Sequence, residues 1–291
     1  MRTHPMTRRD LVSAAAAAAL GALARPSRAA ENAPAAPWPL YAFGNAFGKN
    51  EIATIEENCR LLKDLGYAGI ELHLNPAALP KALEALDRHG LTLYGIYATP
   101  NVEDAPADWS GWIQTLKGRP TRIELGLRSK AFKPSDPAGD EKGLAWLKTL
   151  SDACADAGPL VSVYPHAGFW TERCEDGVRL AQAAGRKNVG THFNLVHWQW
   201  VKPSPPIPGV LAEAKPHLFA VTINGLKGPA EGRQTIRPLD DSDFDLAGFL
   251  AEARRVGYTG PVGLQCYSVQ EPPPDHLMRS MTAWRKMTAG L

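Results

Sequence analysis

Short apolar runs and longer stretches with helical spacing alternate along the chain from residue 40 onward. Within 51–66, for example, Ile55, Cys59 and Leu62 recur at helical intervals, and Gly66 follows the last apolar position. This spacing predicts a helix that buries one face and ends at the glycine. The apolar runs are predicted strands and occupy 40–48, 67–74, 91–100, 121–129, 160–168, 189–196, 218–226 and 261–268.

Each predicted strand is followed by a helical stretch, and the connections are short except for 227–243. Strict alternation predicts a parallel sheet with helices outside it. Eight such units in roughly 250 residues match the size of a closed (β/α)8 barrel, the TIM barrel. An open, doubly wound sheet would use fewer strands and usually a glycine-rich turn, but no GxGxxG follows the first run. We therefore predict one α/β barrel of eight parallel strands with outer helices over 40–291.

The first 29 residues differ from the rest in composition. A basic start, MRTHPMTRRD, precedes the apolar stretch LVSAAAAAALGALA, and SRA at 27–29 has the form of a cleavage site. This order is typical of a secretory signal, and the pair Arg8 and Arg9 resembles the twin-arginine type. The apolar stretch is shorter than the ~20 residues needed to cross a membrane. We expect a signal peptide at 1–29, a linker at 30–39 and a periplasmic or secreted mature protein.

Charge and cysteine usage narrow the expected partners. The chain has 32 basic side chains, of which five lie in the first 29 residues, so 27 (32 less 5) remain. It has 30 acidic side chains, of which one lies there, so 29 (30 less 1) remain. A slightly negative net charge does not favour binding to nucleic acid, which is itself negatively charged. No later apolar run is long enough to span a membrane. We therefore expect neither as a partner of the mature protein. The four cysteines form no CxxC pair; an oxidising compartment would permit disulfides, but we favour buried thiols.

The C-terminal ends of the predicted strands supply the candidate site, because TIM-barrel active sites lie at that face. Alternation along each strand identifies the inward side chains, and the stretch after the sixth strand adds a histidine and two indoles. The candidates form a polar and aromatic cup: Glu71, His73, Glu124, Tyr164, His166, His192, Asn194, His197, Trp198, Trp200, Thr222, Asn224, Gln265 and Tyr267. In the long connection 227–243, Lys227 and Arg233 could hold an acidic sugar.

Several of these residues also have a purely structural interpretation. Glu71 could be a salt-bridged barrel filler, although a charge inside a barrel requires a partner. His73 could be hydrogen-bonded in the core, and Trp198 and Trp200 could pack at the rim. Two indoles beside a polar cup also suit the apolar face of a sugar ring, so we expect them to bind substrate.

Five segments in this order resemble the sugar phosphate isomerase/epimerase family of xylose isomerase-like barrels. They are LGYAGIEL (65–72), YPHAG (164–168), THFNLVH (191–197), IRPLDDSDFD (236–245) and GYTGPVGLQCY (257–267). The resemblance covers residues from about 40 to the end. It implies a TIM barrel and proton transfer on a sugar, in which a divalent metal polarises the carbonyl.

The metal ligands that the resemblance implies are replaced in this chain. The family holds its metal with Glu, Asp, His and Glu on strands five to eight, and the matching positions are Tyr164, Asn194, Thr222 and Gln265. A divalent cation facing only neutral oxygens binds weakly, so we expect the inherited site to be lost and no metal cofactor. The same amides, hydroxyls and imidazoles suit a neutral polyol. The alternative is a relocated divalent metal on Glu71, His166, His192 and His197.

The residues leave more than one function open. The first is an exported carbohydrate enzyme that transfers a proton without a metal, as an isomerase, an epimerase or a β-eliminating lyase on a keto-sugar. The second is a non-catalytic sugar-binding relative. The third, a nuclease like the endonuclease branch of the same superfamily, has no support from charge or metal ligands. We expect the first, with a small-molecule carbohydrate as partner, Glu71 as the base and His166 or His197 as the acid.

Overall fold

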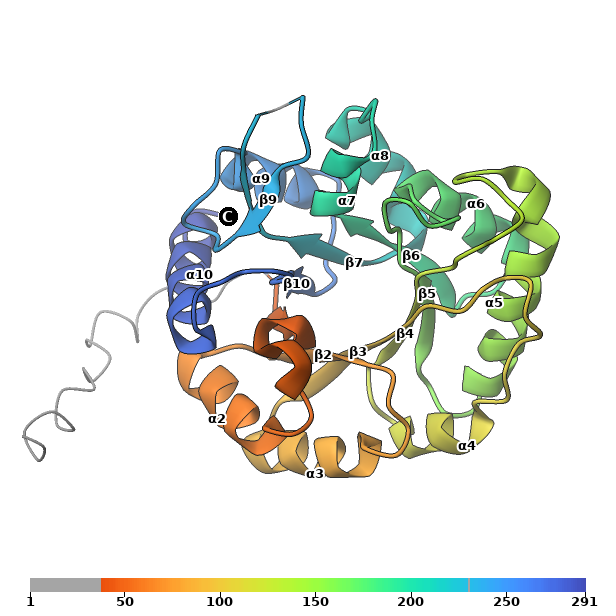
Figure 1. Ribbon diagram of the computed structural model, residues 1–291, viewed down its shortest axis with the longest axis horizontal. Helices are drawn as coiled ribbons and strands as arrows, with labels where there is room; N and C mark the ends of the chain where they lie inside the picture. The colour runs from red at the N-terminus through yellow and green to blue at the C-terminus, as the bar shows by residue number, and fades with distance from the viewer. Residues whose placement is uncertain (1–37, 230) are drawn as a thin grey trace, which may run out of the picture. The chain divides into compact units, whose positions relative to one another are not determined.

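The computed structural model describes residues 38–229 and 231–291, and the predicted signal peptide lies outside these residues. Eight parallel strands close into a barrel with helices around it (Figure 1), which confirms the fold predicted from the alternating pattern. Neighbouring strands around the barrel follow the order β1-β10-β7-β6-β5-β4-β3-β2. The strands are β1 (Leu40–Phe43), β2 (Gly69–His73), β3 (Thr92–Ala98), β4 (Arg122–Leu125), β5 (Leu160–Val163), β6 (Val189–Asn194), β7 (Leu218–Ile223) and β10 (Val262–Leu264).

The outer helices bury apolar stripes against the strands. In α2, Ile55, Cys59 and Leu62 are buried as predicted, and Gly66 ends the helix with a left-handed φ of 90° that favours glycine. The helices are α2 (Ile55–Leu65), α3 (Leu79–His89), α4 (Ser110–Ile113), α5 (Asp140–Cys154), α6 (Cys174–Ala184), α7 (Leu195–Trp200), α8 (Ile207–Ala214), α9 (Leu246–Arg255) and α10 (Pro273–Thr288). None of the described helices is long and apolar enough to span a membrane.

The inside of the barrel is aromatic and polar rather than aliphatic. Tyr41, Phe43 and Tyr164 form one buried cluster, with Tyr94 and Tyr97 packed against it. The aliphatic residues of the strands instead point outward and pack beneath the helices. The barrel therefore presents rings and polar groups to whatever enters from the strand ends. The four cysteines are buried free thiols, as predicted.

Two segments depart from the predicted pattern. The first apolar run is a strand only to Phe43, and 44–50 form a 3₁₀ helix. Gly44 permits this turn because a Cβ there would lie 2.2 Å from Glu51 Oε2 and 3.0 Å from Glu71 O. In the long connection, β8 (Gly225–Lys227) and β9 (Thr235–Arg237) form an antiparallel hairpin. Strands of three residues are too short to show an alternating pattern, so the sequence did not reveal them.

Candidate active site

A cavity of about 260 Å³ lies at the C-terminal ends of the barrel strands. Its volume is close to the lower end of the roughly 300–1,000 Å³ range of small-molecule sites. The cavity therefore suits one small polar molecule. The lining side chains are aromatic, amide, imidazole, charged and aliphatic: Phe43, Asn45, Glu71, His73, Tyr97, Tyr164, His166, Val196, His197, Trp200, Arg233, Ile236, Gln265 and Tyr267.

Nine residues singled out from the sequence come together at this cavity. They are Glu71, His73, Tyr164, His166, His197, Trp200, Arg233, Gln265 and Tyr267. All but Arg233, which lies in the long connection, are at or just beyond a strand end, where the barrel geometry places an active site. The structure thus places the three predicted catalytic side chains around one volume.

Two predicted substrate-binding residues lie below the cavity instead of in it. Glu124 and His192 are fully buried, and His192 Nε2 is 3.1 Å from Glu124 Oε1. The other imidazole nitrogen of His192 is 2.7 Å from the Ser162 hydroxyl, and Arg122 forms an ion pair with Glu124 at 3.4 Å. The prediction that both side chains point into the barrel is confirmed, but they lie in a deeper layer than the cavity. The expectation that they line the site was wrong.

Trp198 was predicted to bind substrate but does not line the cavity. It lies on helix α7, where its indole N–H donates to the Pro205 carbonyl at 2.8 Å. Its ring packs at 6.4 Å from Phe193 and 6.1 Å from Phe244, measured between centroids. Because α7 is helical, Trp198 and Trp200 point to different sides. Trp200 faces the cavity, and Trp198 takes the packing role.

Three further predicted residues lie outside the cavity lining. Asn194 Oδ1 caps α7 by accepting from the His197 N–H at 3.4 Å. Asn224 is fully buried and donates to its neighbouring carbonyl, that of Gly225, at 2.7 Å. Lys227 forms ion pairs with Asp241 at 3.2 Å and Asp243 at 3.0 Å. Surface carboxylates thus pair with Lys227, and each amide makes one local backbone bond, while Asn194 Nδ2 and Asn224 Oδ1 are buried without a hydrogen-bond partner among the described residues.

Two cavity histidines are anchored on one backbone unit, that of Ala167. His166 Nδ1 lies 3.0 Å from the Ala167 carbonyl oxygen, which can only accept a hydrogen bond. The Ala167 N–H donates to His197 Nδ1 at 3.2 Å. In their neutral forms, His166 is therefore protonated on Nδ1 and His197 on Nε2. The remaining Nε2 atoms are a bare acceptor on His166 and an N–H donor on His197.

These imidazoles are the centre of a continuous stack. The His166 and His197 centroids are 4.0 Å apart, and Phe169 lies on the other face of His166 at 3.9 Å. Trp200 meets His197 edge-on at 5.2 Å. A guanidinium covers each outer ring: Arg128 lies 5.4 Å from Phe169, and Arg233 lies 3.7 Å from Trp200.

This environment keeps the imidazoles neutral. Burial lowers the pKa of His166, and the charges of Arg233 and Arg128 lower it further. Burial also holds the pKa of His197 well below its usual range, together with the neighbouring His166 and Arg233. The charged form of an imidazole is disfavoured both by desolvation and by nearby cations. Both rings are thus uncharged at neutral pH.

Glu71 faces the cavity from β2 with its carboxyl group almost completely buried. No hydrogen bond to this carboxyl group is formed by residues 38–229 or 231–291. Burial raises the pKa of Glu71 well above its usual range, and Glu124 and Glu51 raise it further. Gly95 permits the approach of the two carboxyl groups, because a Cβ there would lie 2.2 Å from Glu124 Oε1. Burial beside two other carboxyl groups thus favours the protonated form of Glu71, on a side chain that lines the cavity.

His73 sits at the rim and is paired with Glu51. Its Nδ1 is 2.9 Å from Glu51 Oε2, and its backbone N–H donates to Glu51 Oε1 at 3.1 Å. The hydrogen bond to Glu51 raises the pKa of His73. The charge that His73 carries when protonated is thus balanced by Glu51 at this side of the cavity. This partner could not be predicted from the sequence, because Glu51 lies just beyond the 3₁₀ turn that follows β1.

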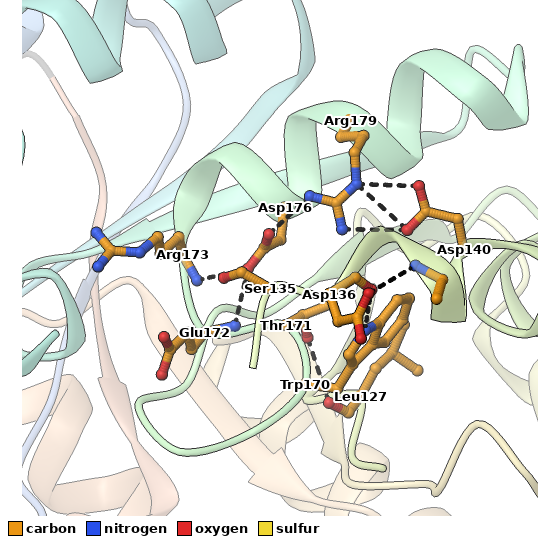
Figure 2. A network of polar contacts seen from close by, with 11 residues as sticks. Leu127, Ser135, Asp136, Asp140, Trp170, Thr171, Glu172, Arg173, Asp176 and Arg179 are labelled. Carbon is orange, nitrogen blue, oxygen red and sulfur yellow. Dashed lines mark hydrogen bonds and ion pairs between the residues drawn. The ribbon is translucent and has the colours of Figure 1, made fainter. Parts of the chain in front are cut away.

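The loop that carries His166 is fixed by a buried carboxylate. Asp176, at the start of α6, accepts hydrogen bonds from the backbone N–H groups of 172–173 at 3.0 Å and from the Ser135 hydroxyl at 2.7 Å. Arg179 completes an ion pair with it at 2.7 Å. Figure 2 shows these groups converging from the two neighbouring loops. The network holds the β5–α6 loop, and thus His166, in place.

Sequence reasoning missed several lining residues, of which Tyr97 is the most informative. The β2–β3 pairing passes from Ile70↔Leu93 to Glu71↔Gly95, so Tyr94 is an extra residue in β3. This bulge shifts the alternation, and both Tyr94 and Tyr97 pack against the interior aromatic cluster. A strict period of two cannot identify both residues. Phe43 and Asn45 were also missed, since no residue of the first predicted strand was chosen as a candidate, although alternation over 40–48 gives both the same side.

The donors at the inherited metal positions do not fit a divalent cation. Gln265 Nε2 donates to the Tyr164 hydroxyl at 3.3 Å, and Gln265 Oε1 accepts from Asn45 Nδ2 and from the Tyr267 N–H. Asn194 caps a helix, and the buried Thr222 hydroxyl is neutral. No carboxylate is present at these four positions to offset the charge of a metal.

The structure also gives no support to the alternative of a relocated metal site. Among the residues that the structure describes, no three His, Cys, Asp or Glu side chains are arranged to hold a metal ion. His192, one of the four proposed ligands, is bound to Glu124 and Ser162 below the cavity. We therefore derive no step through a metal.

The comparisons with known proteins agree with this architecture. A family model described as the xylose isomerase-like TIM barrel matches residues 59–287. A search of curated proteins gave no significant match. Among solved structures, the 3-keto-D-glucoside 4-epimerase from E. coli has a TM-score of 0.67 and 16% identity over 86% of this chain and 99% of its own.

Two further solved structures show the same fold at low identity. The D-allulose 3-epimerase from Methylomonas sp. has a TM-score of 0.68 and 13% identity over 87% of this chain and 98% of its own. A xylose isomerase-like TIM barrel protein from Mycobacterium smegmatis, in complex with magnesium, has a TM-score of 0.65 and 16% identity over 87% of this chain and 97% of its own.

Proposed function

Because this chain belongs to the family of xylose isomerase-like TIM barrels, we propose that it is an enzyme that isomerises or epimerises a carbohydrate by moving a proton beside a carbonyl group. Its own side chains take the place of a metal in this proposal, since the donors at the family's metal positions are neutral. Two of the similar structures are named as epimerases, which supports this class of reaction.

The arrangement of Glu71 with the His166–His197 pair carries the proposal. His166 Nε2 accepts the proton from the carbon next to the substrate carbonyl. The protonated Glu71 carboxyl group donates to the carbonyl oxygen, and the His197 Nε2–H stabilises the charge that develops there. The result is an enediol. The sugar is isomerised when His166 returns the proton to the former carbonyl carbon and the Glu71 carboxylate takes the proton of the neighbouring enediol hydroxyl. It is epimerised when the enediol turns over in the cavity, so that His166 returns the proton to the opposite face of the original carbon and Glu71 takes back the proton that it gave to the carbonyl oxygen.

These roles reverse the assignment made from the sequence, in which Glu71 was the base and a histidine the acid. Burial beside Glu124 and Glu51 favours the proton on Glu71. Burial beside two cations favours neutral imidazoles. At neutral pH the carboxyl group is then the donor and the imidazole the acceptor. A β-elimination on a keto-sugar would begin with the same proton abstraction.

The proposal is tested by exchange of deuterium from solvent into sugars. The protein is incubated in D₂O with a panel of ketoses and keto-glycosides, and incorporation is followed by mass spectrometry. His166→Gln keeps a polar side chain but removes the base, so exchange should fall at least about 100-fold. Lys227→Gln is the matched control, because Lys227 lies outside the cavity and pairs with surface carboxylates.

Exchange at the parent rate in the His166→Gln variant would remove His166 from the mechanism. Binding of a sugar without any exchange would instead favour the non-catalytic sugar-binding function. We further propose export by the twin-arginine signal at 1–29. N-terminal sequencing of the protein recovered from the periplasm or medium checks that proposal, and an intact Met1 there would contradict it.

A further inference from the structure

Arg233 is a cation that lines the cavity and has no acidic partner among the described residues; Arg128, which stacks on Phe169, also lacks one but does not line the cavity. Arg233 lies between β8 and β9 and lines the cavity, with its guanidinium carbon 3.7 Å from the Trp200 ring centroid. No carboxylate in the described ranges, 38–229 and 231–291, forms an ion pair with it. Lys227 on the same hairpin, in contrast, is paired with Asp241 and Asp243.

The backbone on both sides of Arg233 is fixed to helix α7. Gln199 Nε2 donates to the Gly232 carbonyl at 2.8 Å, and the Gln234 N–H donates to Gln199 Oε1 at 3.2 Å. The Trp200 indole N–H donates to the Gln234 carbonyl at 2.7 Å. The guanidinium therefore lies at a defined position over Trp200, although its side chain is largely exposed.

The charges around the cavity leave that guanidinium unbalanced. His73 at the rim is matched by Glu51, and the deeper Arg122 is matched by Glu124. The raised pKa of Glu71 favours its protonated form, and the lowered pKa values of His166 and His197 favour their neutral forms. A ligand with one negative charge would supply the missing partner, and a planar guanidinium matches a carboxylate in bidentate geometry.

We propose that Arg233 binds a carboxylate of the substrate, so that the cavity takes an acidic sugar such as a hexuronate in preference to a neutral sugar. This inference rests on the proposed carbohydrate function and names its substrate class. It selects, for Arg233, the acidic sugar that the sequence left open beside the neutral polyol, and leaves Lys227 outside the site. The guanidinium of Arg233 stacks on Trp200, and Trp200 contacts His197. The proposed carboxylate would therefore bind next to the imidazole pair that transfers the proton.

Matched pairs of sugars test the proposal by isothermal titration calorimetry. Glucose, galactose and mannose are compared with glucuronate, galacturonate and mannuronate, which differ from them only at C6. In at least one pair the uronate should bind about 10- to 100-fold more tightly, as hydrogen bonds to charged groups contribute. Arg233→Gln should remove this advantage, whereas Lys227→Gln, six residues away on the same hairpin, should retain it.

Three results would overturn the inference. They are equal or absent binding of the uronates in every pair, an advantage that survives in Arg233→Gln, and tighter binding of glucose 6-phosphate than of any uronate, which would identify the anion as a phosphate. None of these three results tests the proposed reaction, because they concern only which sugar binds. Deuterium exchange into neutral sugars would still support that reaction, and its absence from both neutral and acidic sugars would contradict it.

Discussion

The barrel holds histidines in two layers, and the bonds of their ring nitrogens differ. In the lower layer, both nitrogens of His192 are occupied, one by Ser162 and one by Glu124. At the cavity, His166 and His197 each use one nitrogen on Ala167 and leave the other for a ligand. An imidazole anchored at both ends supports the barrel. One anchored at a single end is oriented for chemistry.

The largest expected effect is a loss of unfolding free energy when the histidine of the lower layer is truncated. His192→Ala removes a fully buried ring and leaves Glu124 without its imidazole partner. Breaking such a buried pair costs about 3–5 kcal/mol, measured as the free energy of unfolding in urea. His166→Ala, at the cavity, should cost less than about 1.5 kcal/mol. Equal losses in the two variants would erase the distinction between the layers.

The stability of a Glu71→Gln variant should respond to pH in a defined direction. The raised pKa of Glu71 means that the folded protein keeps a proton that the unfolded chain releases above roughly pH 4.3. The parent therefore loses stability as pH rises from there through the folded pKa, and the amide variant does not. Unfolding at pH 5 and pH 8 should show the variant gaining stability relative to the parent. A constant difference would mean that Glu71 is ionised in the fold.

The smallest effect concerns the cation at the end of the stack. The charge of Arg233 lowers the pKa of both His166 and His197, so Arg233→Gln should raise both. The other charge that acts on His166 is Arg128, and His166 itself acts on His197. NMR titration of the imidazole protons measures the change, with Lys227→Gln as the control. A downward shift, or an equal shift in the control, would argue against a direct charge effect.

The sequence was sufficient for the barrel and for the layer of residues at the strand ends. Strand and helix periodicity identified all eight barrel strands, and alternation placed Glu71 and His166 correctly. It could not assign depth, because residues two apart on a strand face the same interior at different levels. Glu124 and His192 were therefore taken for lining residues.

Other features depend on contacts that have no periodic signal. The bulge at Tyr94 moves Tyr97 to the cavity, and the turn after Phe43 brings Glu51 to His73. The anchoring of both imidazoles on Ala167 depends on two loops that are distant in sequence. Charge balance around Arg233 likewise requires the folded positions of its neighbours.

The central claim is that Ala167 holds His166 and His197 as neutral imidazoles of opposite tautomer. Nitrogen NMR of protein labelled in histidine tests it most directly, with a titration from pH 8 to pH 5. We predict a proton on Nδ1 of His166 and on Nε2 of His197, and midpoints for both rings below the ordinary value of about 6.5. The same tautomer on both rings, or a midpoint above that value, would contradict the account.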